Sequence, residues 1–273
     1  MTAKEAPLTG RAALISGSGR GIGRAIALSL ADAGATVVVL ARHEDQVAET
    51  VALITERGGR AIGAAADLRD RGAVDALAVD VLGRTGGIDI LVNNAGVNAK
   101  RPFIPLPVSD GEVIGQAGSG PANVGMSDEE WDTILDTHVR ASMQLIRLFG
   151  PGMLERRWGR VINIGSSAVD RAPNLSGPYT VAKGTLTHLT RALAKEWAAF
   201  GVTVNAVSPG HFRTEMSKAL HDSESGQAWL RDRIPMRHAG DVRELGALAA
   251  FLAGDMASFI TGQVIYVDGG ETL

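Results

Sequence analysis

The chain has 273 residues, of which 45% are hydrophobic, and its formal net charge at pH 7 is −3. This charge excludes the strongly basic surface that binds nucleic acid or anionic membranes, so we expect neither partner. The sequence contains no cysteine, which excludes disulfides, thiolate metal sites and thiol catalysis. Residues 1–10 hold no apolar signal segment, and no apolar run approaches the roughly 20 residues that span a bilayer. We therefore expect a cytoplasmic protein with a large core.

Strand-like and helix-like segments alternate along the chain. The predicted strands are 12–16, 36–40, 61–65, 88–93, 160–164, 202–207 and 263–267. The predicted helices are 22–33, 44–57, 70–84, 128–156 and 177–200, with further helical stretches near 215–233 and 242–252. This alternation predicts an α/β fold, namely a doubly wound Rossmann-type parallel sheet of about seven strands with helices on both faces. No linker composition divides the chain, so we expect a single domain over residues 1–273.

The segment 98–126 interrupts the alternation. It holds four prolines and several glycines without periodicity, and it is longer than an ordinary connection. Ser127 and Glu130 then have the spacing of a capping box, which places the next helix after the segment and makes 98–126 a loop insertion.

The insertion leaves the carboxyl end of the fourth predicted strand, where ligands bind in doubly wound sheets. It is placed either to cover the substrate or to contact a neighbouring subunit; alternatively it is only a surface excursion. An apolar inner face would come from Phe103, Ile104, Leu106, Val108, Val113 and Ile114.

A glycine-rich turn follows the first predicted strand and opens the first predicted helix. Glycine lets the backbone approach a phosphate closely, and a helix N-terminus offers free N–H groups. The candidate phosphate-binding residues are Gly17, Ser18, Gly19, Arg20, Gly21, Ile22 and Gly23. The alternative is a strand–helix turn without a ligand.

Tyr179 and Lys183 stand four residues apart in a predicted helix, so their side chains share one face. A nearby ammonium favours the phenolate and lowers a tyrosine pKa from its ordinary value near 10. The pair is therefore a candidate acid–base unit, although such a pair on a surface helix can arise by chance.

These features occur together with further motifs in a fixed order. They are Asp67-Leu68, Asn93-Asn94-Ala95-Gly96, Ser166, Asn205-Ala206-Val207-Ser208-Pro209-Gly210, Thr261-Gly262 and Asp268-Gly269-Gly270. With its Gly-x-x-x-Gly-x-Gly turn, the chain resembles the single-domain short-chain dehydrogenases/reductases over about residues 10–270. The resemblance implies hydride transfer between a nicotinamide dinucleotide and a carbonyl or secondary alcohol.

The resemblance also implies roles for individual residues. The cofactor-contacting set would include Asp67 and Leu68 at the adenine, with Asn94, Ala95, Gly96, Pro209, Gly210 and Thr214 along the dinucleotide. Tyr179 would be the general acid or base, and Lys183 would hold the nicotinamide ribose. Ser166, 13 positions before the tyrosine, would stabilise the substrate oxygen; Ser167 is the alternative, one residue out of register.

The preferred dinucleotide depends on the residues after the second strand. NAD-binding proteins usually carry an acidic residue there, whereas this chain has Ala41 followed by Arg42. Arg20 in the turn and Arg42 can clamp a 2′-phosphate, so NADP(H) is preferred in this interpretation and NAD(H) is the second possibility. Alternatively, both arginines are solvated surface residues.

His138 occupies the place at which the family usually carries a fourth catalytic residue, an asparagine. An imidazole both donates and accepts protons, so His138 is a candidate relay to Lys183; the alternative is that it only packs. His211 either reaches the substrate or stabilises a turn. The histidines show no metal-ligand spacing, so we expect no metal.

Three functional hypotheses stay open. The first is a carbonyl reductase or secondary-alcohol dehydrogenase acting on CH–OH and C=O groups of a small molecule. The second is a 3-oxoacyl thioester reductase acting on a carrier protein or coenzyme A; Arg157 fits this hypothesis, whereas Phe200 replaces a second basic residue. The third is a cofactor-binding sensor without catalysis. The family resemblance further implies a homotetramer or homodimer formed through the long helices.

Overall fold

The computed structural model describes residues 6–108 and 122–273. Within them, seven parallel strands form one sheet in the order β3–β2–β1–β4–β5–β6–β7. The strands are β1 Ala12–Ser16, β2 Thr36–Ala41, β3 Arg60–Ala65, β4 Ile90–Asn93, β5 Gly159–Ile164, β6 Val202–Pro209 and β7 Val264–Val267. The expected doubly wound sheet is confirmed.

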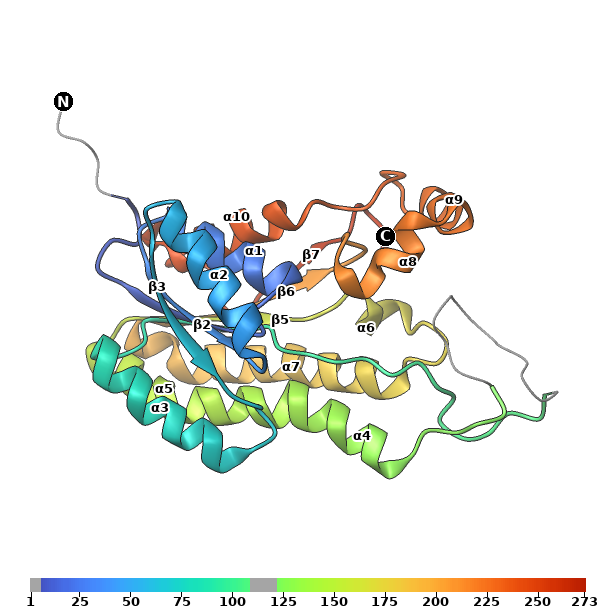
Figure 1. Ribbon diagram of the computed structural model, residues 1–273, viewed down its shortest axis with the longest axis horizontal. Coiled ribbons are helices and arrows are strands. Elements are labelled where there is room, and N and C mark those ends of the chain that lie inside the picture. Colours follow the sequence, from blue (N-terminus) through green and yellow to red (C-terminus); the bar gives the residue numbers. More distant parts are fainter. Residues whose placement is uncertain (1–5, 109–121) are drawn as a thin grey trace.

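Helices cover both faces of the sheet (Figure 1). One face carries α1 Gly21–Asp32, α2 Glu44–Glu56 and α10 Val242–Ala253. The other carries α3 Arg71–Thr85, α4 Asp128–Leu135, α5 Ala141–Arg156 and α7 Gly177–Trp197, with a π-helical turn η1 Asp136–Arg140 between α4 and α5. Shorter pieces are α6 Ala168–Arg171, η2 Ala198–Phe200, η3 Glu215–Ser217, α8 Lys218–Asp222, α9 Glu224–Arg233 and η4 Asp255–Ala257.

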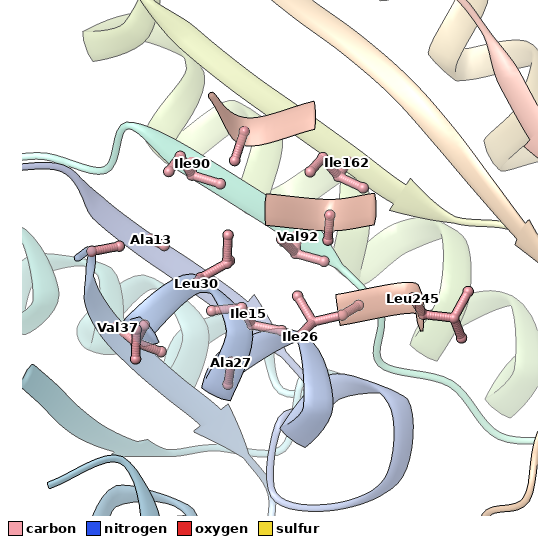
Figure 2. Packing of buried hydrophobic residues seen from close by; sticks show 14 of the residues in the cluster. Ala13, Ile15, Ile26, Ala27, Leu30, Val37, Ile90, Val92, Ile162 and Leu245 are labelled. Carbon is pink, nitrogen blue, oxygen red and sulfur yellow. The ribbon is translucent and has the colours of Figure 1, made fainter. Parts of the chain in front are cut away.

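Alternate residues of each central strand pack on opposite helical layers. Ile15 of β1 belongs to the same buried cluster as Ile26 of α1 and Leu245 of α10 (Figure 2). Leu14 faces the other way and joins the cluster that contains Phe149 of α5. Each fully buried aliphatic side chain contributes about 1.5–3 kcal/mol of transfer free energy, which explains the continuous apolar runs of these strands.

The chain reverses its winding direction between β1 and β4. From β1 it proceeds outward to β2 and β3, and it then returns to β4 on the opposite side of β1. The loops that leave the carboxyl ends of β1 and β4 therefore diverge, and the crevice between them is where ligands bind in this architecture. The glycine-rich turn leaves β1 at Gly17, and Asn94 follows β4.

The structure refines the expected elements at three places. The predicted helix 128–156 contains the π-helical turn η1, the predicted helical stretch 215–233 consists of η3, α8 and α9, and α6 was not predicted. The capping box of Ser127 and Glu130 is confirmed at the start of α4. Among the described residues, no helix combines the length and apolarity needed to cross a membrane.

The described ends of the insertion pair with each other. The N–H of Leu106 donates to the carbonyl oxygen of Ala122, and Met126 donates to Pro102, both at 2.9 Å. Phe103 and Ile104 are 70% and 64% exposed, so the expected apolar inner face is wrong for these two residues in the single chain. Val113 and Ile114 lie outside the described residues.

Candidate active site

A cavity of about 420 Å³ opens at the carboxyl end of the sheet. It brings together almost all of the site residues expected from the sequence. They are Gly17, Gly19, Arg20, Gly21, Ile22, Gly23, Arg42, Asp67, Leu68, Asn94, Ala95, Gly96, His138, Ser166, Tyr179, Lys183, Pro209, Gly210 and Thr214. Ser18 is the exception: its buried hydroxyl donates to Ile15 O at 2.7 Å and accepts from Leu40 N at 3.0 Å, so it fastens the turn to the sheet.

The glycine-rich turn has the geometry of a phosphate cradle. Gly17 has a φ of +66°, and a Cβ there would lie 2.8 Å from the Cα of Ala95. Helix α1 begins after Arg20, whose side chain makes no capping hydrogen bond, and the first turn contains no acidic residue. The N–H groups of that turn thus lack a side-chain acceptor, which fits the pyrophosphate of a dinucleotide.

Asn94 joins this turn to the neighbouring strand. Its Nδ2 donates to the carbonyl oxygens of Ser16 at 2.9 Å and Gly17 at 3.1 Å. A Cβ at Gly23 would lie 2.2 Å from the carbonyl oxygen of Gly17 and 2.5 Å from Asn94 Nδ2. The packing therefore leaves no room for a side chain at position 23.

Three arginines surround the end of the cavity near β2 and β3. Arg20 forms an exposed ion pair with Glu215 at 2.7 Å, and both residues line the cavity. Arg42 donates to the ring of its neighbour His43 at 3.2 Å. Arg69 binds the carboxylate of Asp67 at 2.7 Å, and this interaction lowers the pKa of Asp67 to about 2. Arg69 was missed from the sequence; its only signal is its position two residues after the expected adenine contact.

Tyr179 and Lys183 reach the cavity from one face of α7, as expected. Lys183 Nζ donates to the carbonyl oxygen of Ile164 at 2.7 Å and lies 5.7 Å from the centre of the Tyr179 ring. Burial lowers the pKa of Lys183 to about 7. Burial raises the pKa of Tyr179, while hydrogen bonding to Ser166 and the positive charge of Arg171 oppose that increase.

The structure distinguishes the two adjacent serines. Ser166 lines the cavity, and its Oγ accepts a hydrogen bond from the N–H of Ala168 at 3.1 Å. The buried Ser167 accepts from Arg171 Nη2 at 3.1 Å and does not line the cavity. The geometry thus places Ser166 where a hydroxyl can meet a substrate oxygen beside Tyr179.

His138 lies in the π-helical turn η1 and is 1% exposed. Its Nε2 lies 2.7 Å from the carbonyl oxygen and 3.1 Å from the nitrogen of Val97, and its ring meets Tyr179 edge-to-face with centres 5.4 Å apart. Burial, together with the charge of Lys183, lowers the pKa of His138 to about 3, so the imidazole is neutral. Among the described residues, Nδ1 has no hydrogen-bond partner.

Several cavity residues were not anticipated from their sequence context. They are Gln46, Val97, Thr133, Thr137, Phe212 and Ser217. Thr133 and Thr137 are four residues apart in the helix that carries His138, so helical periodicity is the signal that could have found them. The described parts of 98–108 and 122–126 do not line the cavity.

Comparisons with known proteins agree with this geometry. Residues 17–272 match the family described as Enoyl-(Acyl carrier protein) reductase. The chain is 34% identical to the 3-oxoacyl-[acyl-carrier-protein] reductase of Vibrio harveyi, over 96% of this chain and 98% of the relative. It is 31% identical to the 5-keto-D-gluconate 5-reductase of Escherichia coli K12, over 96% of each chain.

A solved structure extends the similarity to three dimensions. The gluconate 5-dehydrogenase of Burkholderia cenocepacia, crystallised in complex with NADP and tartrate, is 33% identical with a TM-score of 0.85. The match covers 98% of this chain and 97% of that one. The chain therefore belongs to the short-chain dehydrogenase/reductase family and is an oxidoreductase that transfers hydride between a nicotinamide dinucleotide and a carbonyl or secondary alcohol.

Proposed function

We propose that the protein reduces the ketone of a small polyhydroxylated carboxylic acid with NADPH and oxidises the corresponding alcohol in reverse. The observation that carries the reaction type is the meeting of Ser166, Tyr179 and Lys183 in one cavity with the glycine-rich turn. The relatives that act on gluconate and 5-ketogluconate support the substrate class.

In the proposed mechanism, Ser166, Tyr179 and Lys183 each have one role. A bound nicotinamide supplies or accepts the hydride. Ser166 donates a hydrogen bond to the substrate oxygen, and Tyr179 protonates that oxygen during reduction. Lys183, whose pKa of about 7 makes both of its protonation states accessible near neutrality, returns a proton toward the tyrosine.

The second candidate is reduction of a 3-oxoacyl thioester, supported by the similarity to the carrier-protein reductase. Arg157 donates to the carbonyl oxygen of Ala199 at 2.7 Å and lies 5.8 Å from the ring of the half-exposed Phe200. An acidic carrier protein would therefore meet the guanidinium of Arg157 beside the apolar ring of Phe200, where the carrier hypothesis expects a second basic residue. This surface favours a small substrate over a carrier protein.

The substrate proposal is tested by assaying 5-ketogluconate, a neutral diketone and acetoacetyl-coenzyme A with NADPH. We expect kcat/KM to be highest for 5-ketogluconate by about tenfold or more, since a hydrogen bond to a charged group contributes about 1.5–3 kcal/mol. A preference for the thioester would favour the second candidate. Failure of all three compounds despite tight NADPH binding would contradict the proposed substrate class and the second candidate alike.

The cofactor preference is also a proposal. Arg20 and Arg42 line the cavity, and Ala41 supplies no carboxylate to repel a 2′-phosphate. We expect kcat/KM with NADPH to exceed that with NADH by about tenfold or more, and Arg42→Ala to reduce this ratio mainly through the KM of NADPH. Arg84→Ala, which removes an exposed guanidinium from α3, is the matched control. A higher kcat/KM with NADH would contradict the assignment.

We propose that His138 acts as a neutral proton relay. Nε2 lies against Val97, so Nδ1 is the ring atom left to accept a proton and to return it. We expect His138→Ala to lower kcat by about tenfold or more and to change its pH profile. Exposed His188→Ala is the control for loss of an imidazole. An unchanged kcat and pH profile would leave His138 with packing alone.

We also propose assembly into a homodimer or homotetramer in the cytoplasm. The exposed apolar side chains of Phe251, Met256 and Phe259, together with those of Phe103 and Ile104, supply surfaces that a second copy can cover. The cysteine-free sequence suits a reducing compartment. Light scattering that gives the 28.5 kDa mass of one chain would contradict the assembly. Cell fractionation tests the location, and we expect the protein in the cytoplasmic fraction.

A further inference from the structure

A buried carboxylate joins two walls of the active site. Glu271, in the segment after β7, is enclosed with only 3% of its side chain exposed. Its Oε1 lies 2.7 Å from Arg171 Nη1, on α6, and 3.2 Å from His211 Nε2, in the loop after β6. Among the described residues the carboxylate oxygens have no hydrogen-bond partner of regular geometry, so the buried charge depends on these two ion-pair contacts, which link the three segments.

The segment after β7 is folded so that Glu271 points inward. The carboxylate of Asp268 accepts hydrogen bonds from the N–H groups of Gly270 at 2.9 Å and Thr272 at 3.0 Å, and from the Thr272 hydroxyl at 2.7 Å. A Cβ at Gly210 would lie 2.6 Å from Asp268 Cβ, so this turn packs directly on the loop that follows β6. The inward position of Glu271 is therefore built into the local backbone.

Both partners of Glu271 belong to the surroundings of the reacting groups. Arg171 ends the short helix α6, which begins two residues after Ser166, and its Nη2 donates to Ser167 Oγ at 3.1 Å. His211 lines the cavity, and its ring meets Trp229 edge-to-face with centres 5.1 Å apart. Movement of Glu271 would release the segment after β5 and the segment after β6 together.

The charges around Tyr179 give Arg171 a second role. Lys183 on the same helix donates to the carbonyl oxygen of Ile164, His138 on η1 is neutral, and Ser166 offers a hydroxyl. The positive charge of Arg171 favours the phenolate and lowers the pKa of Tyr179 against the effect of burial. Around Arg171 itself stand Glu271, His211 and the neighbouring Asp170, whose carboxylate faces Tyr266.

We propose that Glu271 is a positioning residue for the hydride-transfer reaction. It holds Arg171 against Ser167, the neighbour of Ser166, and it fixes the spacing between α6 and the loop that carries His211. This inference rests on the proposed role of Tyr179. It adds Glu271, which is remote from Tyr179 in the sequence, as a residue that affects its ionisation.

The chain permits a direct test because it contains only two tyrosines, Tyr179 and Tyr266. In a Tyr266→Phe background, the ultraviolet absorbance of the phenolate reports the ionisation of Tyr179 with or without turnover. We expect Arg171→Met to raise the titration midpoint by about one pH unit, because an opposite charge is lost, while Arg171→Lys stays closer to the parent. Circular dichroism of the same samples shows the pH range over which the protein stays folded, and only that range is used to determine the midpoint.

Glu271→Gln separates positioning from simple charge neutralisation. If Glu271 positions Arg171, the guanidinium leaves its buried place and the midpoint rises, as in Arg171→Met. If Glu271 only neutralises Arg171, the midpoint falls, and the proposal is overturned. Arg84→Met, which removes an exposed ion pair with Asp80 on α3, is the matched control and should leave the midpoint unchanged.

Steady-state kinetics supply the second measurement. Glu271→Gln is expected to raise the KM of the carbonyl substrate about fivefold or more, while the Kd of NADPH stays within about twofold. If Arg171→Met leaves the titration midpoint of Tyr179 unchanged, the electrostatic role of Arg171 is wrong, even if the activity falls. If the titration midpoint of Tyr179 shifts as expected in the variants but the parent protein reduces no carbonyl substrate, the proposed function is contradicted. The inference about Glu271 and Arg171 would then still stand.

Discussion

Replacing Tyr179 by Phe is expected to lower kcat for carbonyl reduction by about 10²–10⁴-fold, because the substitution removes the hydroxyl that we propose protonates the developing alkoxide. The ring, its packing against His138 and the shape of the cavity are retained. Initial rates of NADPH oxidation with saturating ketone measure the effect directly. The Kd of NADPH, measured by fluorescence, should change by less than about threefold.

Tyr266→Phe is the matched control for this experiment. Tyr266 is the other tyrosine of the chain, lies on β7 and does not line the cavity. The control should therefore keep its activity. A Tyr179→Phe enzyme that retains a tenth or more of the parent kcat would show that another group protonates the substrate.

Gly23→Ala is expected to weaken NADPH binding by about 100-fold, or about 3 kcal/mol. The new Cβ would lie 2.2 Å from the carbonyl oxygen of Gly17, which is backbone and cannot move aside without opening the turn. The turn that we propose as the pyrophosphate site would widen, and the hydrogen bond from Asn94 Nδ2 to the carbonyl oxygen of Gly17 would be lost at the same time. Fluorescence titration with NADPH measures the Kd.

Gly83→Ala provides the control for adding a methyl group at a helical glycine. Gly83 lies in α3, and a Cβ there meets no atom within 4 Å. Its melting temperature should equal or slightly exceed that of the parent, because alanine favours a helix over glycine, and its Kd for NADPH should match that of the parent. If Gly23→Ala melts like the parent and still binds NADPH normally, the turn is not the pyrophosphate site.

The layered fold could be predicted because its signals are local. The β-branched run at 36–40 is apolar on both faces, as a central parallel strand requires, and Gly34 ends the preceding helix with a φ of +99°. The π-helical turn at 136–140 was not predictable, because it depends on how His138 packs against Val97 and Tyr179.

The candidate reacting residues Tyr179 and Lys183 could be predicted because one helical turn joins them and because the glycine-rich turn, Ser166 and the other family motifs surround them in the sequence. Contacts between distant segments could not. Arg20 and Glu215 are 195 positions apart, and no local pattern indicates that they form an ion pair at the cavity. Glu271 likewise gives no sequence signal, because its importance arises only when β5, β6 and β7 bring their following loops together.

The central claim is direct hydride transfer between the nicotinamide and the carbonyl carbon of the substrate. Isotopic labelling of the transferred hydride tests it most directly. The protein should be mixed with a ketone that it reduces and with NADPH carrying deuterium at the transferable position of the nicotinamide. We predict one deuterium on the carbinol carbon of the product, measured by mass spectrometry, and the same labelling in the residual turnover of Tyr179→Phe. Product formed with a solvent hydrogen at that carbon would contradict direct hydride transfer in this cavity.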